Sequence, residues 1–203
     1  YITPQEFNLF ADQAQKEIFE QYFYDLNQYM RVPGNSEEYS DIIHNINEKI
    51  VIFEKEANIS YGSIQADDIY RLGTIIANGN TIVEEVQQDD ILEMMGTPLT
   101  EPTPSRPVYV RTGMKSATFY PTFSFTGKCT YIKIPSKPSW GYVVVNQRAM
   151  YDSSNKTDFE LHPSEENELV YKILKFAGLS MKRDDLAKGG QGLESLQIQQ
   201  EKQ

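Results

Sequence analysis

The sequence predicts an α+β protein with an N-terminal helical hairpin, a central antiparallel β-rich region with a β-hairpin, and a C-terminal helix with a flexible tail. Two observations lead to this order. Apolar residues recur at intervals of three and four in residues 1–58 and again after Pro163, as in amphipathic helices. Between them, residues 59–161 form short β-branched and aromatic runs separated by Gly, Pro and Asn, as in short strands.

The first segment is expected to form a long helix. Thr3 and Glu6 match a capping box, with Pro4 at the first helical position. The apolar stripe that follows has helical spacing and includes Ala11, Ala14, Ile18, Tyr22 and Leu26. Phe7 and Phe10 belong to this stripe, and Phe19 and Phe23 widen it. All four phenylalanines are candidate interface residues. A stripe this wide indicates either a helix contacted on more than one side or a helix packed on its own domain.

A second helix should follow a break at Pro33-Gly34-Asn35, with Ser36 as its cap. Its apolar stripe runs from Tyr39 to Phe53. Two helices joined by a short turn predict an antiparallel helical hairpin over residues 1–58.

The β-rich region begins with a strong hairpin signal at residues 69–86. Two β-branched runs flank Asn78-Gly79, which suits the positive φ angles of a type I′ turn. Residues 89–95 are then expected to make one or two helical turns.

Residues 97–107 form a proline-rich arm, because TPLTEPTPSRPVYVR (97–111) contains four prolines that resist helix and ladder pairing. The arm is expected to run extended over the surface, either as an inert connection or as a contact to a neighbouring molecule. In the second case Pro102 and Pro104 are candidate interface residues.

Further short strands are expected between residues 107 and 161, in an antiparallel sheet or small sandwich. Asn146-Gln147 and residues 152–155 should form turns between some of them. The expected strands are 108–111, 118–125, 129–134, 141–145, 149–151 and 159–161.

The last helix is expected within residues 162–181 and should pack back on the first two. Ser164 is its expected cap, Glu165 and Glu166 suit its positive end, and Gly178 is expected just past its last residue.

Residues 182–203 are expected to be flexible or docked on a partner, because they include Gly189-Gly190 and a Gln-rich end. If the tail docks, the candidate anchors are Leu193, Leu196 and Ile198.

The net charge of the chain indicates which classes of partner to expect. The 203 residues include 19 basic and 29 acidic ones, a formal charge of −10. A protein this acidic is repelled by phosphate backbones, so sequence-specific nucleic-acid binding is not expected. Acidic faces suit either simple solubility or a surface along which DNA passes without sticking. No apolar run approaches the roughly 18 residues that span a bilayer, so no membrane partner is expected.

No catalytic, cofactor-binding or metal-binding residues are predicted. Cys129, the single cysteine, lies in a strand-like stretch and reads as a small core residue. His44 and His162 lack a companion at metal-ligand spacing. The paired acids read as solvated surface, since neighbouring residues on a strand or helix do not face one another.

Three stretches resemble a family of virion structural proteins of crAss-like phages and their marine relatives: YITPQEFNLFADQAQKEIFEQYF (1–23), TPLTEPTPSRPVYVR (97–111) and WGYVVVNQRAMYDSSNKTDFELHPSEENELVYKILKFAGL (140–179). The most specific piece, residues 160–179, joins the last expected strand directly to the last helix. More loosely, the plan resembles ring-forming adaptor and tubular tail proteins of podoviruses.

The resemblance implies a non-enzymatic subunit of the phage neck or tail, assembled in the host cytoplasm. Its partners would be about eleven further copies in a twelvefold ring, the portal protein and other connector or tail proteins, with passing DNA contacted non-specifically if at all. Two other hypotheses stay open. A receptor- or glycan-binding tail module predicts exposed aromatic residues on one sheet face, and a virion-associated hydrolase predicts converging carboxylates with a raised pKa.

Overall fold

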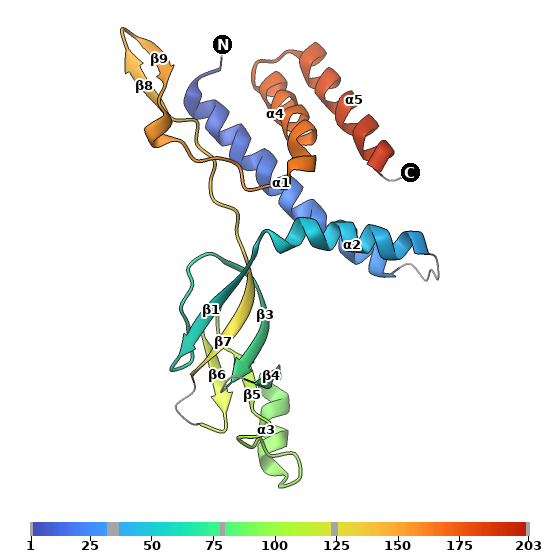
Figure 1. Ribbon diagram of the computed structural model, residues 1–203, viewed down its shortest axis with the longest axis vertical. Helices are drawn as coiled ribbons and strands as arrows, with labels where there is room; N and C mark the ends of the chain where they lie inside the picture. Colours follow the sequence, from blue (N-terminus) through green and yellow to red (C-terminus); the bar gives the residue numbers. More distant parts are fainter. Residues whose placement is uncertain (1, 32–36, 78–79, 123–125, 202–203) are drawn as a thin grey trace. The chain divides into compact units, whose positions relative to one another are not determined.

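The computed structural model describes residues 2–31, 37–77, 80–122 and 126–201, and it has the α+β class that the sequence predicts (Figure 1). The chain divides into two compact units. The helical unit comprises Tyr1–Ile52 and Pro135–Gln203, and the sheet unit comprises Phe53–Ile134.

Helix α1 (Pro4–Arg31) begins with the predicted capping box. The Thr3 amide donates to Glu6 Oε2 at 2.8 Å, and the Glu6 amide donates to Thr3 Oγ1 at 3.3 Å. These two bonds satisfy backbone donors that a helix start otherwise leaves unpaired. The apolar stripe packs inside the helical unit, with Ala11, Ala14, Ile18, Phe19, Tyr22 and Phe23 buried.

Helix α2 (Glu37–Val51) packs on α1. The expected break at Pro33-Gly34-Asn35 and the Ser36 cap lie outside the described residues. The helix stops before residue 58, because strand β1 (Glu54–Ser60) takes over the chain. Each residue of β1 has a partner on β7 (Thr126–Lys133). The free energy of this strand pairing outweighs the local preference for helix that the apolar spacing up to Phe53 indicated.

The sheet unit holds one seven-stranded sheet in the order β2-β1-β7-β3-β4-β5-β6. Its remaining strands are β2 (Ser63–Ile64), β3 (Ile69–Ala77), β4 (Thr81–Glu85), β5 (Val108–Arg111) and β6 (Ala117–Tyr120). The predicted hairpin of residues 69–86 is present as β3 and β4, while its Asn78-Gly79 turn lies outside the described residues. One pair, β4 with β5, is parallel instead of antiparallel. Parallel neighbours need a long crossover, which residues 86–107 supply.

The two end strands of this sheet meet. Ser63 bridges Ser116, the Ile64 amide donates to the Lys115 carbonyl at 2.9 Å, and the Ala117 amide donates to the Gly62 carbonyl at 2.9 Å. The sheet therefore curls into a barrel-like closure that pairs its edges. Gly62 suits this crossing because its φ is +78° and a Cβ there would lie 2.7 Å from the Ala117 oxygen.

The core of the sheet unit fills the inside of this curl. Its buried cluster includes Ile59, Ile64, Ile69, Ile75, Val83, Tyr109, Phe119 and Cys129. Cys129 is 1% exposed and its thiol contacts the Ala57 carbonyl at 3.6 Å, so it is the core residue that the sequence predicts. Burial raises the pKa of this thiol.

The segment after β4 differs from the expected extended arm. Helix α3 (Gln88–Gly96) forms as predicted, and its Ile91 packs on β5. Residues 97–107 then make backbone turns, in which the Thr100 amide donates to the Thr97 carbonyl at 3.0 Å and the Arg106 amide to the Thr103 carbonyl at 2.9 Å. Proline lacks a backbone N–H donor, but neighbouring residues can still form the hydrogen bonds that close such turns.

The expected β-rich region of residues 59–161 is split between the units. Strands β8 (Tyr142–Val145) and β9 (Arg148–Tyr151) form a separate two-stranded sheet in the helical unit, called the hairpin below. The expected strand at residues 159–161 is not a strand, because the Glu160 amide bonds to a side chain of α1 instead of a ladder. A 3-10 turn, η1 (Ser153–Asn155), separates the two segments.

Helix α4 (Glu166–Ser180) packs on α1 and is entered through a 3-10 turn, η2 (Pro163–Glu165). The cap differs from the expected Ser164, since His162 Nδ1 accepts from the Ser164 amide at 3.2 Å. The helix also continues through Gly178 instead of ending there.

Residues expected to form a flexible tail form helix α5 (Asp184–Glu201), which packs along α4. Two glycines lie where the helices cross. A Cβ on Gly178 would lie 2.6 Å from the Ala187 nitrogen, and one on Gly190 would lie 3.0 Å from the Lys175 nitrogen. In the sequence, Gly178 indicated a helix end and Gly190 a flexible tail. In the structure, both glycines allow the backbones of α4 and α5 to approach closely.

Candidate functional site

The hairpin is fixed at its base by two amide side chains of α1. Asn8 Oδ1 accepts from the Trp140 amide at 2.8 Å, just before β8. Gln15, which is fully buried, donates to the Ser136 carbonyl at 2.8 Å and accepts from the Glu160 amide at 2.9 Å. Because one helix bonds both the entering and the leaving segment, the hairpin projects from a defined position at the N-terminal end of α1 (Figure 1).

The strands of the hairpin are joined by the predicted turn at Asn146-Gln147, whose φ angles are 48° and 62°. Residues that lie opposite one another share a face of the two-stranded sheet. One face carries Tyr142, Tyr151, Val144 and Ala149, and the other carries Val143, Met150, Val145 and Arg148. Arg148 is the only charged residue among 142–151.

Both faces of the hairpin expose apolar side chains. On the first face Val144 is 64% and Tyr151 56% exposed, and on the second Met150 is 57% exposed. Two strands with water on both faces are marginally stable at best, and contiguous exposed apolar surface marks contact sites. The hairpin is therefore the strongest candidate contact element in the described part of the chain.

An aromatic group covers the start of the first face. The Trp140 ring stacks on Tyr142 with centroids 5.9 Å apart and on Tyr151 with centroids 6.5 Å apart. Stacked aromatic rings of this kind suit either a protein interface or a sugar ring.

The hairpin also lies in a stretch of unusual charge. Residues 102–151 contain no Asp or Glu and seven basic residues: Arg106, Arg111, Lys115, Lys128, Lys133, Lys137 and Arg148. All 29 acidic residues lie outside it. The candidate interface residues predicted from the sequence omit the hairpin, although this acid-free stretch and the run YVVV with no polar alternation were both visible signals.

A groove in the helical unit forms a second candidate site. It lies between α1, α2, the start of α4 and the end of α5 and has a volume of about 400 Å³. Its apolar and aromatic lining includes Ile18, Tyr22, Tyr29, Ile42, Ile46 and Ile198. Its charged lining comprises Asp25, Glu48, Lys49, Glu165 and Glu168, so that four carboxylates face one lysine.

The predicted solvated pair of acids at 165–166 is split by the fold. Glu165 is 1% exposed instead of solvated, and its carboxylate lies 2.5 Å from Lys49 Nζ on α2. Burial raises the pKa of the nearby Glu168 to about 7, and Glu165 adds to this rise by like-charge repulsion. Converging carboxylates and a raised pKa are what the hydrolase hypothesis predicts.

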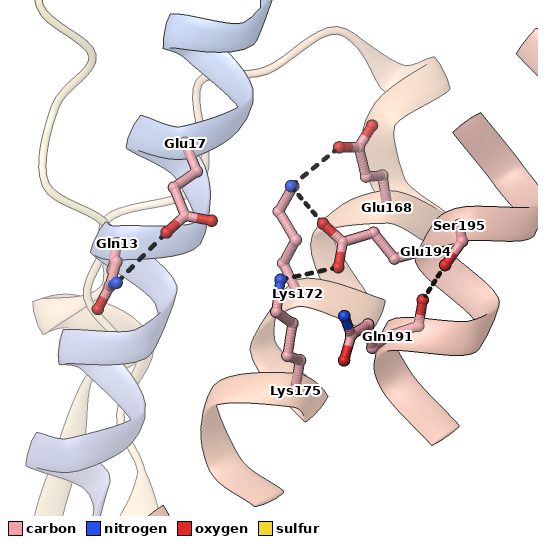
Figure 2. A network of polar contacts seen from close by, with 8 residues as sticks. All are labelled: Gln13, Glu17, Glu168, Lys172, Lys175, Gln191, Glu194 and Ser195. Atoms are coloured by element: carbon pink, nitrogen blue, oxygen red, sulfur yellow. Dashed lines mark hydrogen bonds and ion pairs between the residues drawn. The ribbon is translucent and has the colours of Figure 1, made fainter. Parts of the chain in front are cut away.

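Each of these carboxylates has a lysine partner, as in a structural ion-pair network. Lys172 Nζ lies 3.3 Å from Glu168 and 2.7 Å from Glu194, and Lys175 lies 3.0 Å from Glu194 (Figure 2). Burial opposes the charge of Lys172, but its bond to Glu194 and the attraction of Glu168 outweigh burial and raise its pKa. The network ties α4 to α5, which accounts for the order of the predicted tail.

The structure separates the predicted interface residues into three groups. Phe19 and Phe23 are buried within the chain and pack edge to face at 5.1 Å, so they are core residues and not contact residues. Pro102 is also buried. Phe7, Phe10 and Ile198 are half-buried, while Pro104, Leu193 and Leu196 are exposed.

The two histidines considered for chemistry lie in different places, and His162 lines the groove beside Ser164 and Glu165. His44 lies on the surface of α2, 3.6 Å from Glu48, and His162 caps η2. Among the described residues, no group of three or more His, Cys, Asp or Glu side chains has the arrangement of a metal site. Nor does any helix of the described ranges combine the length and hydropathy needed to cross a membrane.

No protein-family model matches the chain, and no curated protein matches it significantly.

Proposed function

We propose that this chain is a structural subunit of a tailed-phage virion, in a ring of the head-to-tail connector or upper tail. The observation that carries the proposal is the hairpin, whose two faces both expose apolar side chains. A surface of this kind requires a partner on each face, which a subunit packed between two neighbours has.

The resemblance of residues 1–23, 97–111 and 140–179 to virion proteins of crAss-like phages supports the same class. The last of these stretches contains the hairpin, Trp140 and Glu160 at its base, and all but the last residue of α4. The subunit would join the portal to the tail, with about twelve copies around the axis, and would work by contact with its neighbours and not by turnover of a substrate.

The net charge of −10 supports a role along the path of DNA. A channel wall with excess negative charge repels phosphate groups, so DNA slides past it without being trapped. Acidic residues are expected to outnumber basic ones on the face that lines the channel. A lumen that is uniformly basic in the assembled particle would contradict this part of the proposal.

Electron microscopy of the intact particle, together with native mass spectrometry of the purified chain, tests the assignment. Rings of about a dozen copies next to the portal or in the tail are the expected result. A density map that places the chain in the capsid shell or at fibre tips would overturn it. A monomer in solution would not, since a portal can be needed as a template.

The stacked aromatic residues of the hairpin favour one second candidate, a glycan-binding tail module. Trp140, Tyr142 and Tyr151 offer a surface on which a sugar ring can stack. Binding to a glycan array that is lost in Tyr151→Ser, by a chain that stays monomeric or trimeric, would favour this candidate over the ring.

The hydrolase hypothesis is tested with the groove. If the purified chain hydrolyses a sugar, peptide or nucleotide, and Glu168→Gln abolishes the activity, then the structural assignment fails. We expect no turnover above a buffer control, because the carboxylates of Glu165 and Glu168 are each held by a lysine.

A further inference from the structure

The hairpin and the groove lie toward opposite ends of α1. The base of the hairpin bonds to Asn8, near the start of this helix, whereas the groove reaches Asp25 and Tyr29 near its end. At 1.5 Å per residue, Asn8 and Asp25 are about 25 Å apart along the helix axis. Figure 1 shows the hairpin at the N-terminal end of α1 and α2 at the other end, so a hairpin cannot enter the groove of its own chain.

The two sites have complementary chemistry. Residues 135–151 carry Lys137 and Arg148 and no carboxylate, and the Arg148 guanidinium is exposed with no partner among the described residues. Besides the Glu165–Lys49 ion pair, the groove lining carries the carboxylates of Asp25 and Glu48, set among isoleucine and tyrosine side chains. A tip that is apolar and basic thus matches a groove that is apolar and acidic.

We propose that the hairpin of one copy docks into the groove between α1 and α2 of a second copy. Val145 and Met150 cover Ile42 and Ile46, and Arg148 lies against the carboxylates of Asp25 and Glu48. This inference rests on the proposed ring function and specifies which surfaces the neighbouring subunits use.

The contact explains how copies that each carry a charge of −10 associate, because it joins the acid-free stretch of one chain to an acidic site on the next. It is heterologous, since each copy gives its hairpin to one neighbour and its groove to the other. Heterologous contacts close into a ring when the rotation between copies allows it.

Disulfide trapping tests the contact in the full-length chain. The variant Gln147→Cys/Asn45→Cys places one thiol at the exposed hairpin tip and one at the exposed rim of the groove. Cys129 does not interfere because it is 1% exposed. After oxidation at high protein concentration, we expect multimers whose digests contain the 147–45 linked peptide.

Matched controls separate docking from random collision. Gln147→Cys/Glu20→Cys carries its second thiol on the exposed surface of α1 outside the groove lining and should give at least tenfold less of the corresponding linked peptide. A mixture of the two single variants, Gln147→Cys and Asn45→Cys, should give a 147–45 dimer but no higher multimer. Equal yields from groove and control variants, or no 147–45 peptide, would overturn the inference.

Charge reversal provides a second, independent test of the contact. Adding Arg148→Glu to the trapping variant should lower the rate of 147–45 linkage at least tenfold, and adding Glu48→Arg to that variant should restore it. An unchanged rate in Arg148→Glu contradicts the assigned ion pair.

The outcomes also separate this inference from the ring assignment. Rings in the wild-type chain without 147–45 linkage would remove the inference and leave the assignment standing. A 147–45 linkage in solution with no ring in the particle would support the contact and contradict the ring assignment.

Discussion

The side chain of Gln15 on α1 accepts a hydrogen bond from the backbone amide of Glu160, 145 residues later in the chain, at 2.9 Å. The Gln15 side-chain nitrogen donates to the Ser136 carbonyl at 2.8 Å, and the Glu160 carboxylate accepts from the Ser136 amide at 2.7 Å. Three bonds thus fasten the start and end of the hairpin segment to one another and to the helix. Gln15 is the residue on which the position of the hairpin depends most directly.

Gln15→Ala should lower the free energy of unfolding by about 1–3 kcal/mol, because it removes a fully buried side chain together with its two part-buried hydrogen bonds to the Glu160 amide and the Ser136 carbonyl. Urea unfolding measures the loss, and hydrogen exchange at the Glu160 amide should become faster. Gln13→Ala is the matched control, since the Gln13 side chain is exposed and donates to Glu17 at 3.3 Å. Its effect should stay within about 0.5 kcal/mol. Equal losses for both variants would show that the clamp contributes little.

Gly178→Ala should destabilise the packing of α5 on α4 by about 1–3 kcal/mol, because the added methyl would meet the backbone of Ala187 at 2.6 Å. Gly189→Ala, in the same helix pair, should instead stabilise the protein by about 0.5–1 kcal/mol, since a Cβ there meets nothing within 4 Å. Thermal unfolding of both variants checks the opposite signs. If both raise the melting temperature, α4 and α5 do not pack as described.

Lys172→Met should lower the free energy of unfolding by about 1–3 kcal/mol, because it removes the cation that bonds Glu194 and Glu168 while Lys175 remains beside Glu194. Lys156→Met removes an exposed pair with Asp158 and should leave the stability almost unchanged, because water screens such a pair. Chemical denaturation compares the two losses. A small effect at Lys172 would mean that water or Lys175 replaces its charge.

Glu168 predicts how stability depends on pH. Its carboxyl keeps its proton up to about pH 7 in the folded chain, whereas in the unfolded chain it loses the proton near the ordinary value of 4.5. Between these values the folded state binds more protons, so this group makes the protein less stable as the pH rises. Above about pH 7 its contribution no longer changes.

Denaturation midpoints measured from pH 4.5 to 7.5 in the wild type and in Glu168→Gln test this dependence. The variant should lose less stability than the wild type as the pH rises across that range. Parallel curves for the two proteins would show that Glu168 titrates at its ordinary pKa.

Local signals in the sequence determined much of the secondary structure. The capping box of Thr3 and Glu6, the β-branched runs around Asn78-Gly79, the turn at Asn146-Gln147 and the burial of Cys129 each follow from a few neighbouring residues. Such features need only a preferred φ angle, a nearby side-chain oxygen or an apolar run, all of which the sequence displays directly.

The tertiary structure alone decided what the same local signals left open. Gly178 and Gly190 suggested a helix end and a flexible tail, but they lie at a helix crossing whose partner backbone no local pattern reveals. Likewise, the helical spacing of apolar residues extended to Phe53, but the residues after it pair with β7 and form strand β1. Burial and pairing depend on residues far apart in the chain, and their free energy outweighs local propensity wherever the two conflict.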